Sequence, residues 1–455
     1  MGSISDHQAS VEDRISELPD TILCHVLSFL ETVHAVRTTV LSTRWNNLWT
    51  KVPNLHFDYY PSFSPKYEDE DADVCRNHFM TFVDRVLFFR DSSKIQNFTL
   101  SCFEESDFTR IDGWLCTATR RNVVKLDFGL HNICKYDRRV TFSFPQSLFK
   151  CKTLEVLKLS SNCTTYYPPT SGCFPSLKFL HITLHNSHDT SAGQLISCCP
   201  LLEGLTIDGH VGTRGDSVDV HFNISASKLK TLTISLSAYP TSPYNVLINA
   251  PNLKSINLSH NTVAYYSFEN VSSLVNANIV LEACQEKERS TVFANRVIAL
   301  MGAISNVKHL SLSGECAEGC CHQYFLPEYF LPEELVLQDC CFWDVLPAVL
   351  QISHNLQHLV LEDSTEFRSR FPEHQWYPPE CVPVCLFRLK TISIRRFQGR
   401  HVEMAVAKYL LKNCKVLSKM AIYAGHGITE EKKLHQVFAM FERGSTTCEV
   451  EIIEA

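Results

Sequence analysis

The sequence predicts an α/β repeat solenoid, with a small helical module before the repeats and an α/β unit after them. Three observations lead to this prediction. One short apolar pattern recurs through most of the 455 residues. A stretch near the start, ISELPDTILCHVLSFLET, carries more apolar residues than a single buried helix face requires. Strand and helix patterns also continue after the last clear repeats, over residues 386–455.

The recurring pattern is an apolar residue, two variable residues, a second apolar residue, one variable residue and a third apolar residue. Its first positions include Leu154, Leu177, Leu202, Leu229 and Leu253. The steps of about 23 to 27 residues match the period of leucine-rich repeats. The last two apolar residues point to one face of a short strand, and stacked neighbours bury that face as a continuous core. Because the steps are uneven, we expect irregular leucine-rich repeats over residues 76–385.

The same pattern recurs further along the chain, with first positions at Val307, Leu356, Leu389 and Leu417. So many copies disfavour the alternative of scattered strands in one globular fold. Before the repeats, FMTFVDRVLFFRD has apolar residues at helical spacing and predicts a first helix of the array. The acidic run PKYEDEDAD, at 65–73, predicts a solvated linker over residues 59–75.

The start of the chain and its composition limit where the protein acts. Residues 1–10 are polar and are expected to form a disordered tail, and no secretory leader is visible there. We therefore expect an intracellular protein, in the nucleus, the cytoplasm or both, and not a secreted one. In these compartments the 20 cysteines should stay reduced, mostly as small buried apolar residues. The net charge of −7 gives no basic field for nucleic acid, and no run of 18 apolar residues could span a membrane.

Residues 11–58 form a candidate module with leftover apolar surface. Pro19 suits the first turn of a helix, and Asp20 places a negative charge near the positive helix end. The following helix has more apolar residues than its own module can cover, and a unit this small is marginal alone. A partner protein is therefore expected, although packing against the repeats is the alternative. We expect Val26, Leu41 and Trp45 to lie in the core of the module.

Residues 13–58 closely resemble the F-box of plant F-box/leucine-rich-repeat proteins. The resemblance rests on Leu18-Pro19-Asp20, the apolar run to Leu30, AVRTTVLSTRW and NLW. It implies a three-helix F-box that binds the adaptor subunit of a cullin-based ubiquitin ligase and, through it, the cullin. By the same resemblance, the adaptor contacts are Leu18, Pro19, Ile22, Leu23, Leu27 and Trp49.

The last segment, residues 386–455, resembles the FBD domain that follows the repeats in one branch of that family. The order of strand, Phe397-Gln398-Gly399, helix, LLKN and strand carries the resemblance. It implies an α/β FBD unit at this end of the chain, and it implies no chemistry for that unit.

Other clusters of reactive residues have spacings that do not suit chemistry. Cys316, Cys320, Cys321 and His322 could suggest zinc, but adjacent cysteines, as also at 340–341, point in opposite directions on an extended segment. We expect no metal and no cofactor. No G-x-S-x-G elbow, P-loop or H-E-x-x-H pattern occurs, so we expect no enzyme activity.

A protein substrate would bind the exposed face of the repeat strands, because solenoids commonly bind partners there. The candidate residues on this face are Lys158, His181, Asp208, Asn257, His309, Gln338, His358, Glu362 and Arg395. They lack the arginine and lysine cluster that a phosphorylated ligand requires. The FBD is the alternative site.

These inferences lead to one functional hypothesis with one alternative. The chain is expected to be a non-catalytic substrate-recognition subunit of an SCF-type cullin–RING ubiquitin ligase. In the alternative, its F-box binds the adaptor but the chain delivers no substrate for ubiquitination.

Overall fold

The computed structural model divides into two compact units. The first comprises residues 1–165 and 169–177, and the second comprises residues 166–168 and 178–455. The residues that the structure describes are 15, 17–60, 72–91, 93–103, 107–131, 143–161, 173–187, 191–211, 220–238, 244–260, 264–281, 291–313, 332–338, 342–363, 376–379, 381–425 and 431–453. The predicted tail at 1–10, the cysteine cluster at 316–322, the pair at 340–341 and most of the acidic linker lie outside them.

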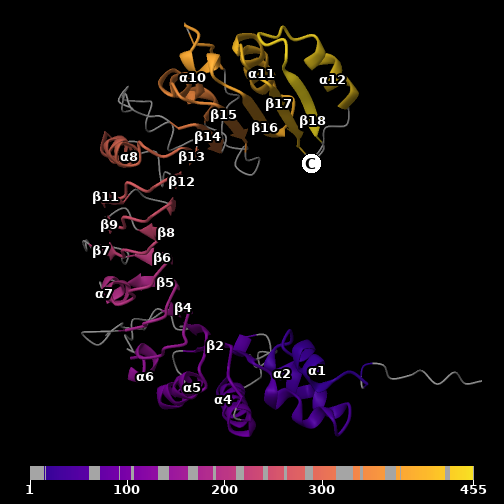
Figure 1. Cartoon of the computed structure of the whole chain (residues 1–455), viewed down its shortest axis with the longest axis vertical. Helices are drawn as coiled ribbons and strands as arrows, with labels where there is room; N and C mark the ends of the chain where they lie inside the picture. The colour runs from indigo at the N-terminus through magenta and orange to yellow at the C-terminus, as the bar shows by residue number, and fades with distance from the viewer. Residues whose placement is uncertain are drawn as a thin grey trace, which may run out of the picture. The chain divides into compact units, whose positions relative to one another are not determined.

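The first unit begins with the predicted helical module (Figure 1). Its elements are α1 (Asp20–Leu27), α2 (Thr32–Arg37) and the 3-10 turns η1 (Thr38–Val40), η2 (Trp45–Asn47) and η3 (Trp49–Lys51). Pro19 precedes the first helical residue, and its carbonyl accepts hydrogen bonds from the backbone N–H groups of Ile22 and Leu23 at 2.9 and 3.1 Å. The module is confirmed, with 3-10 turns in place of a third α-helix.

A parallel sheet follows the module without a break. Its strands are β1 (Asn54–Asp58), β2 (Asn97–Phe103), β3 (Lys125–His131) and β4 (Val156–Ser161), and each pairs with the next in parallel. The helices between them are α4 (Ala72–Phe89), α5 (Phe108–Arg120) and α6 (Gln146–Phe149). Leu55 and Phe57 of β1 are buried and alternate with half-buried neighbours, as in the later strands. The first strand of the array therefore lies within the residues that resemble the F-box.

The second unit contains a longer parallel sheet whose strand order follows the chain. Its first strands are β5 (Phe179–Ser187), β6 (Gly204–Val211), β8 (Thr231–Ala238), β10 (Ser255–His260) and β12 (Asn276–Leu281). The sheet continues through β13 (His309–Ser313), β14 (Glu334–Gln338) and β15 (His358–Glu362). Leucine and isoleucine of the repeat pattern occupy matching register positions and are buried, as with Leu335 and Leu359. The predicted solenoid is confirmed.

The segments that return from one strand to the next differ in structure, which accounts for the uneven repeat length. Some are helices: α7 (Ser191–Ser197), α8 (Thr291–Ala303) and α10 (Phe342–Ile352). Others are strands, β7 (Val220–Ser225), β9 (Tyr244–Asn249) and β11 (Tyr265–Glu269), which form a separate three-stranded parallel sheet. Phe222 and Tyr244 of this second sheet are buried, so it covers the core as the helices do elsewhere.

The segment that resembles the FBD continues the same sheet. It comprises η5 (Val384–Phe387), β16 (Thr391–Phe397), α11 (His401–Asn413), β17 (Lys419–Ala424), α12 (Glu431–Ala439) and β18 (Glu449–Ile453). β16 pairs with β15 in parallel, and β17 and β18 follow in order (Figure 1). The predicted order of strand, Phe-Gln-Gly turn, helix and strand is confirmed.

The Phe-Gln-Gly turn has a structural role at the start of α11. Gly399 has a φ of +73°, a conformation that side chains with a Cβ rarely adopt. The turn lets the buried Glu403 carboxylate accept hydrogen bonds from the backbone N–H groups of Gln398 and Arg400, at 3.0 and 2.9 Å. Burial raises the pKa of the Glu403 carboxyl, and these hydrogen bonds oppose the rise. The motif therefore caps the helix.

Candidate functional site

The N-terminal module has a small core built on one face of α1. Leu23 and Leu27 lie one helical turn apart and are buried against Trp45, Leu48 and Val52. Both leucines are buried within the chain, so they stabilise the module by packing in its core.

A second apolar face of α1 is left uncovered. Ile22 and Val26 lie one helical turn apart on α1, Phe29 follows in the turn after the helix, and the three side chains are 45%, 49% and 77% exposed. Leu30 is also exposed. We call these four residues the exposed α1 stripe. Isolated exposed apolar residues are ordinary, but aligned large ones mark a surface that binds a partner.

The 3-10 turn η1 adds two more exposed apolar side chains. Val40 and Leu41 are 85% and 63% exposed. The expectation that Val26 and Leu41 lie in the core of the module is wrong, whereas Trp45 is buried as expected. The η2 turn supplies the indole that packs against Leu23 and Leu27, whereas Ile22 and Val26 on α1 are only about half covered.

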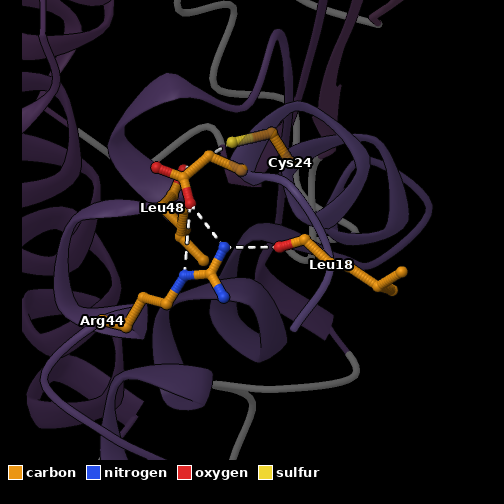
Figure 2. A network of polar contacts seen from close by, with 5 residues as sticks. Leu18, Cys24, Arg44 and Leu48 are labelled. Atoms are coloured by element: carbon orange, nitrogen blue, oxygen red, sulfur yellow. Dashed lines mark hydrogen bonds and ion pairs between the residues drawn. The ribbon is translucent and has the colours of Figure 1, made fainter. Parts of the chain in front are cut away.

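A polar network holds the start of α1 in place. Figure 2 shows the Arg44 guanidinium donating to the Leu18 carbonyl. The Nη2 atom of Arg44 also lies 2.9 Å from Oδ1 of Asp20, the first residue of α1. Close by, the Cys24 thiol donates to the Leu48 carbonyl at 3.5 Å. Arg44 thus fixes the direction in which the exposed α1 stripe points, a role that the sequence pattern did not assign to it.

The six predicted adaptor contacts separate into different environments. Pro19 and Ile22 are exposed, and Leu18 and Trp49 are half-buried. These four are accessible to a partner. Leu23 and Leu27 are buried, so we leave them out of the surface considered below and include Val26, Phe29 and Leu30 instead. The spacing of Ile22, Val26 and Phe29 was the signal in the sequence that could have identified this face.

The module is fixed to the first strands of the repeat array by specific bonds. The Thr32 hydroxyl accepts from the backbone N–H of His56 in β1 at 2.7 Å. Arg90, at the end of α4, donates to the Val52 carbonyl. Burial lowers the pKa of Arg90 to about 10. These contacts lie within the first unit, so module and strands form one packed body.

The residues predicted to bind a substrate all lie on the strands, at outward positions that alternate with buried ones. Most of them pair with a neighbour on the next strand. His181 lies 2.7 Å from Asp208, and His309 lies 2.8 Å from Glu334. Lys158, in the first unit, lies 4.0 Å from Asp127.

The remaining candidates form three further sets across the strands. Asn278 donates to Asn257 at 3.0 Å, His358 shares a hydrogen bond of 2.7 Å with Thr391, and Arg395 donates to Glu362 at 3.2 Å. Gln338 lies beside Glu362 in the register. The structure therefore brings the candidates of the second unit together as rows of a sheet, and no convergent catalytic cluster is formed by the residues described.

Comparison with known proteins agrees with this architecture. Residues 15–57 match the F-box domain, residues 111–318 match the LRR repeats of the FBD-associated F-box protein At5g56370, and residues 378–422 match the FBD. The chain is 32% identical over 443 residues to the putative FBD-associated F-box protein At1g55030 of Arabidopsis thaliana, covering 94% of each chain. It is 31% identical to the F-box/FBD/LRR-repeat protein At2g04230 of the same plant, covering 92% of this chain and 91% of the relative. The chain belongs to the plant F-box/FBD/LRR-repeat protein family.

Two further observations describe this F-box/FBD/LRR-repeat protein. Among the described residues, none of the helices has the length and apolar character to span a membrane. In the same part of the chain, no three histidine, cysteine or acidic side chains are placed to hold a metal ion. The F-box surface and the outward strand face are thus the two candidate functional surfaces of the protein.

Proposed function

We propose that this F-box/FBD/LRR-repeat protein is the non-catalytic substrate-recognition subunit of an SCF-type cullin–RING ubiquitin ligase. The F-box binds the adaptor subunit and through it the cullin, and the strand face holds a protein substrate. This role places the protein in the cytoplasm or nucleus, and it requires no catalytic residue, metal or cofactor in this chain.

The exposed α1 stripe is the observation that carries the proposal. Its side chains lie on a module whose own core is complete without them, so folding does not explain their apolar character. Burying them against a partner removes apolar surface from water, which is the main driving force of protein association. Leu18 and Trp49 pack against the core of the module and are half-buried, so they too remain partly accessible to a partner.

The strand face supplies the second part of the function. A substrate held there stays near the ubiquitin-charged enzyme that the cullin recruits, so its lysines react at a raised effective concentration. The fixed contact between the F-box and β1 supports this role, because the first strands of the array then keep a defined orientation relative to a bound adaptor.

The test uses charge placed on the exposed α1 stripe. The double variant Ile22→Asp, Val26→Asp should lose adaptor and cullin binding in co-precipitation from plant cells, since two charges would be desolvated without partners. Phe88→Asp, at an exposed apolar position of α4, is the matched control and should bind as the wild type does. Unchanged binding by the double variant would contradict the proposal.

A second measurement separates substrate delivery from simple adaptor binding. Proximity labelling with the double variant should reveal proteins that accumulate relative to cells with the wild-type chain, because they are bound but not ubiquitinated. If no labelled protein changes in abundance or ubiquitination, the protein binds the adaptor without delivering a substrate.

A further inference from the structure

The outward side chains on five neighbouring strands of the second unit carry almost no charge. The register of β6, β8, β10, β12 and β13 aligns these side chains in rows across the sheet. The central row consists of hydroxyl and amide groups only, from Thr206, Thr233, Asn257, Asn278 and Ser311. We call it the neutral row. All five side chains are half-buried, so they form an accessible surface.

The titratable groups that flank the neutral row include two histidine–carboxylate pairs formed within the chain. His181 stands next to Thr206 at one end of the row and lies 2.7 Å from Asp208, whereas His309, two residues before Ser311 and in a neighbouring row, lies 2.8 Å from Glu334. A charge on a ligand would therefore find no free counter-charge on the row itself. Complementarity across an interface then favours an uncharged ligand, because a desolvated charge without a partner is strongly unfavourable.

Two groups of the neutral row have unused hydrogen-bonding capacity. Asn278 donates to Asn257 through Nδ2 at 3.0 Å. In the part of the chain that the structure describes, the Asn278 Oδ1 and Ser311 Oγ atoms are buried and have no hydrogen-bond partner. Such groups are normally satisfied in folded proteins. A rotation of the Ser311 hydroxyl or the Asn278 amide presents them to donors and acceptors of a bound chain.

We infer that the neutral row binds an uncharged, extended peptide segment of the substrate, through hydrogen bonds to its backbone and to its serine, threonine, asparagine or glutamine side chains. This inference rests on the proposed function and specifies the substrate class. Phosphorylation within the segment weakens binding, because the phosphate would be desolvated over a row of side chains that contains no arginine or lysine.

The geometry also sets the length and one end of this segment. Five strands at a spacing of about 4.8 Å span roughly 19 Å, which an extended chain covers with about six residues. Beyond Ser311 the row continues with Val336 and Val360 on β14 and β15. Val336 is half-buried and Val360 is buried, so an apolar residue that follows this six-residue stretch would lie over Val336.

The test starts from a library of random peptides displayed on phage and selected on the purified full-length protein. The enriched peptides should contain few charged residues and many serine, threonine, asparagine and glutamine residues. A synthetic enriched peptide should lose at least tenfold in affinity with Asn257→Lys and with Thr233→Lys, measured by fluorescence anisotropy. The same peptide with one phosphoserine or phosphothreonine should also bind at least tenfold more weakly to the wild type.

Asn245→Lys is the matched control, because it introduces the same charge on β9 of the separate three-stranded sheet and should change affinity less than twofold. Enrichment of acidic or basic peptides, tighter binding after phosphorylation, no enrichment, or unchanged affinity in both row variants would each overturn the inference. Adaptor binding measured on the same preparations keeps the two questions apart. If the wild-type chain does not bind the adaptor, the proposed function is wrong, whereas the result of the peptide experiment is unaffected.

Discussion

The energetic contribution of the exposed α1 stripe can be tested with alanine substitutions at Ile22 and Val26. Fully burying such a side chain is worth about 1.5 to 3 kcal/mol. In the free chain Ile22 is 45% exposed and Val26 is 49% exposed, so only about half of that gain is still available on binding. The double variant Ile22→Ala, Val26→Ala should therefore lose about 1.4 to 2.8 kcal/mol of adaptor affinity, or about 10- to 100-fold in Kd.

The same variant should leave the fold intact. Both positions lie within α1 and outside the core cluster, and alanine has a higher helix propensity than isoleucine or valine. The thermal unfolding of the full-length chain should therefore shift little. By contrast, Leu23→Ala should destabilise the module by about 2 to 5 kcal/mol, because Leu23 is fully buried and its truncation leaves a cavity.

Isothermal titration calorimetry with the purified adaptor subunit measures the change, and circular dichroism confirms the fold. Phe88→Ala on α4 serves as a control for removing exposed apolar area outside the F-box. The reasoning would be refuted if the double variant bound the adaptor with wild-type affinity, or if its loss matched that of Phe88→Ala.

Three further predictions concern the stability of the chain and are measured by thermal or urea unfolding. Arg44→Ala should destabilise the F-box by about 1 kcal/mol, since it removes an exposed ion pair with Asp20 and a hydrogen bond to the Leu18 carbonyl. An unfolding curve identical to that of the wild type would contradict this prediction. Gly209→Ala should lower the free energy of unfolding by about 2 to 4 kcal/mol, because Gly209 has a φ of +109° and the added Cβ would lie 1.9 Å from the Leu184 carbonyl oxygen. A variant as stable as the wild type would show that β6 can shift to accommodate the methyl group. Burial raises the pKa of Glu403 above the ordinary value of 4.5, so the wild type loses stability as the pH rises from 4.5 through the raised pKa. The free energy of unfolding of Glu403→Gln should not show this fall with pH. If the difference in free energy of unfolding between the variant and the wild type stays constant with pH, the effect is absent.

The strands of the array could be predicted from the sequence because their signal is local. In each repeat, apolar and polar residues alternate, and one face of the strand must be buried against its neighbours. Leu310, Leu359 and Ile392 were placed correctly for this reason, and their register in the structure follows directly. The copies of the pattern at Leu389 and Leu417 fall within the FBD segment and correspond to β16 and β17, which continue the sheet after β15.

The direction of each apolar face on α1 could not be predicted in the same way. The helix has two apolar stripes, and which one is buried depends on where the Trp45 indole lies, which is set by the turns after α2. The sequence contains no local record of that packing, so Val26 was assigned to the core of the module although it is exposed. The three-stranded sheet of β7, β9 and β11 was missed for a related reason. Its strands alternate as well, as at Phe222 and Ile224, but they fall between the repeat copies.

The position of β1 bears on how an F-box protein of this kind could present a substrate. A flexible linker between module and repeats would let the bound substrate sample many positions, which lowers its effective concentration near the charged enzyme. Here β1 follows η3 after two residues and pairs with β2. The backbone N–H of His56 in β1 donates a hydrogen bond to the Thr32 hydroxyl of the F-box. The acidic segment at 59–75 then joins β1 to the region of α4 inside the array, and it does not separate the F-box from the array. The strand shared by the F-box and the sheet therefore sets the orientation of the first repeats relative to the exposed α1 stripe.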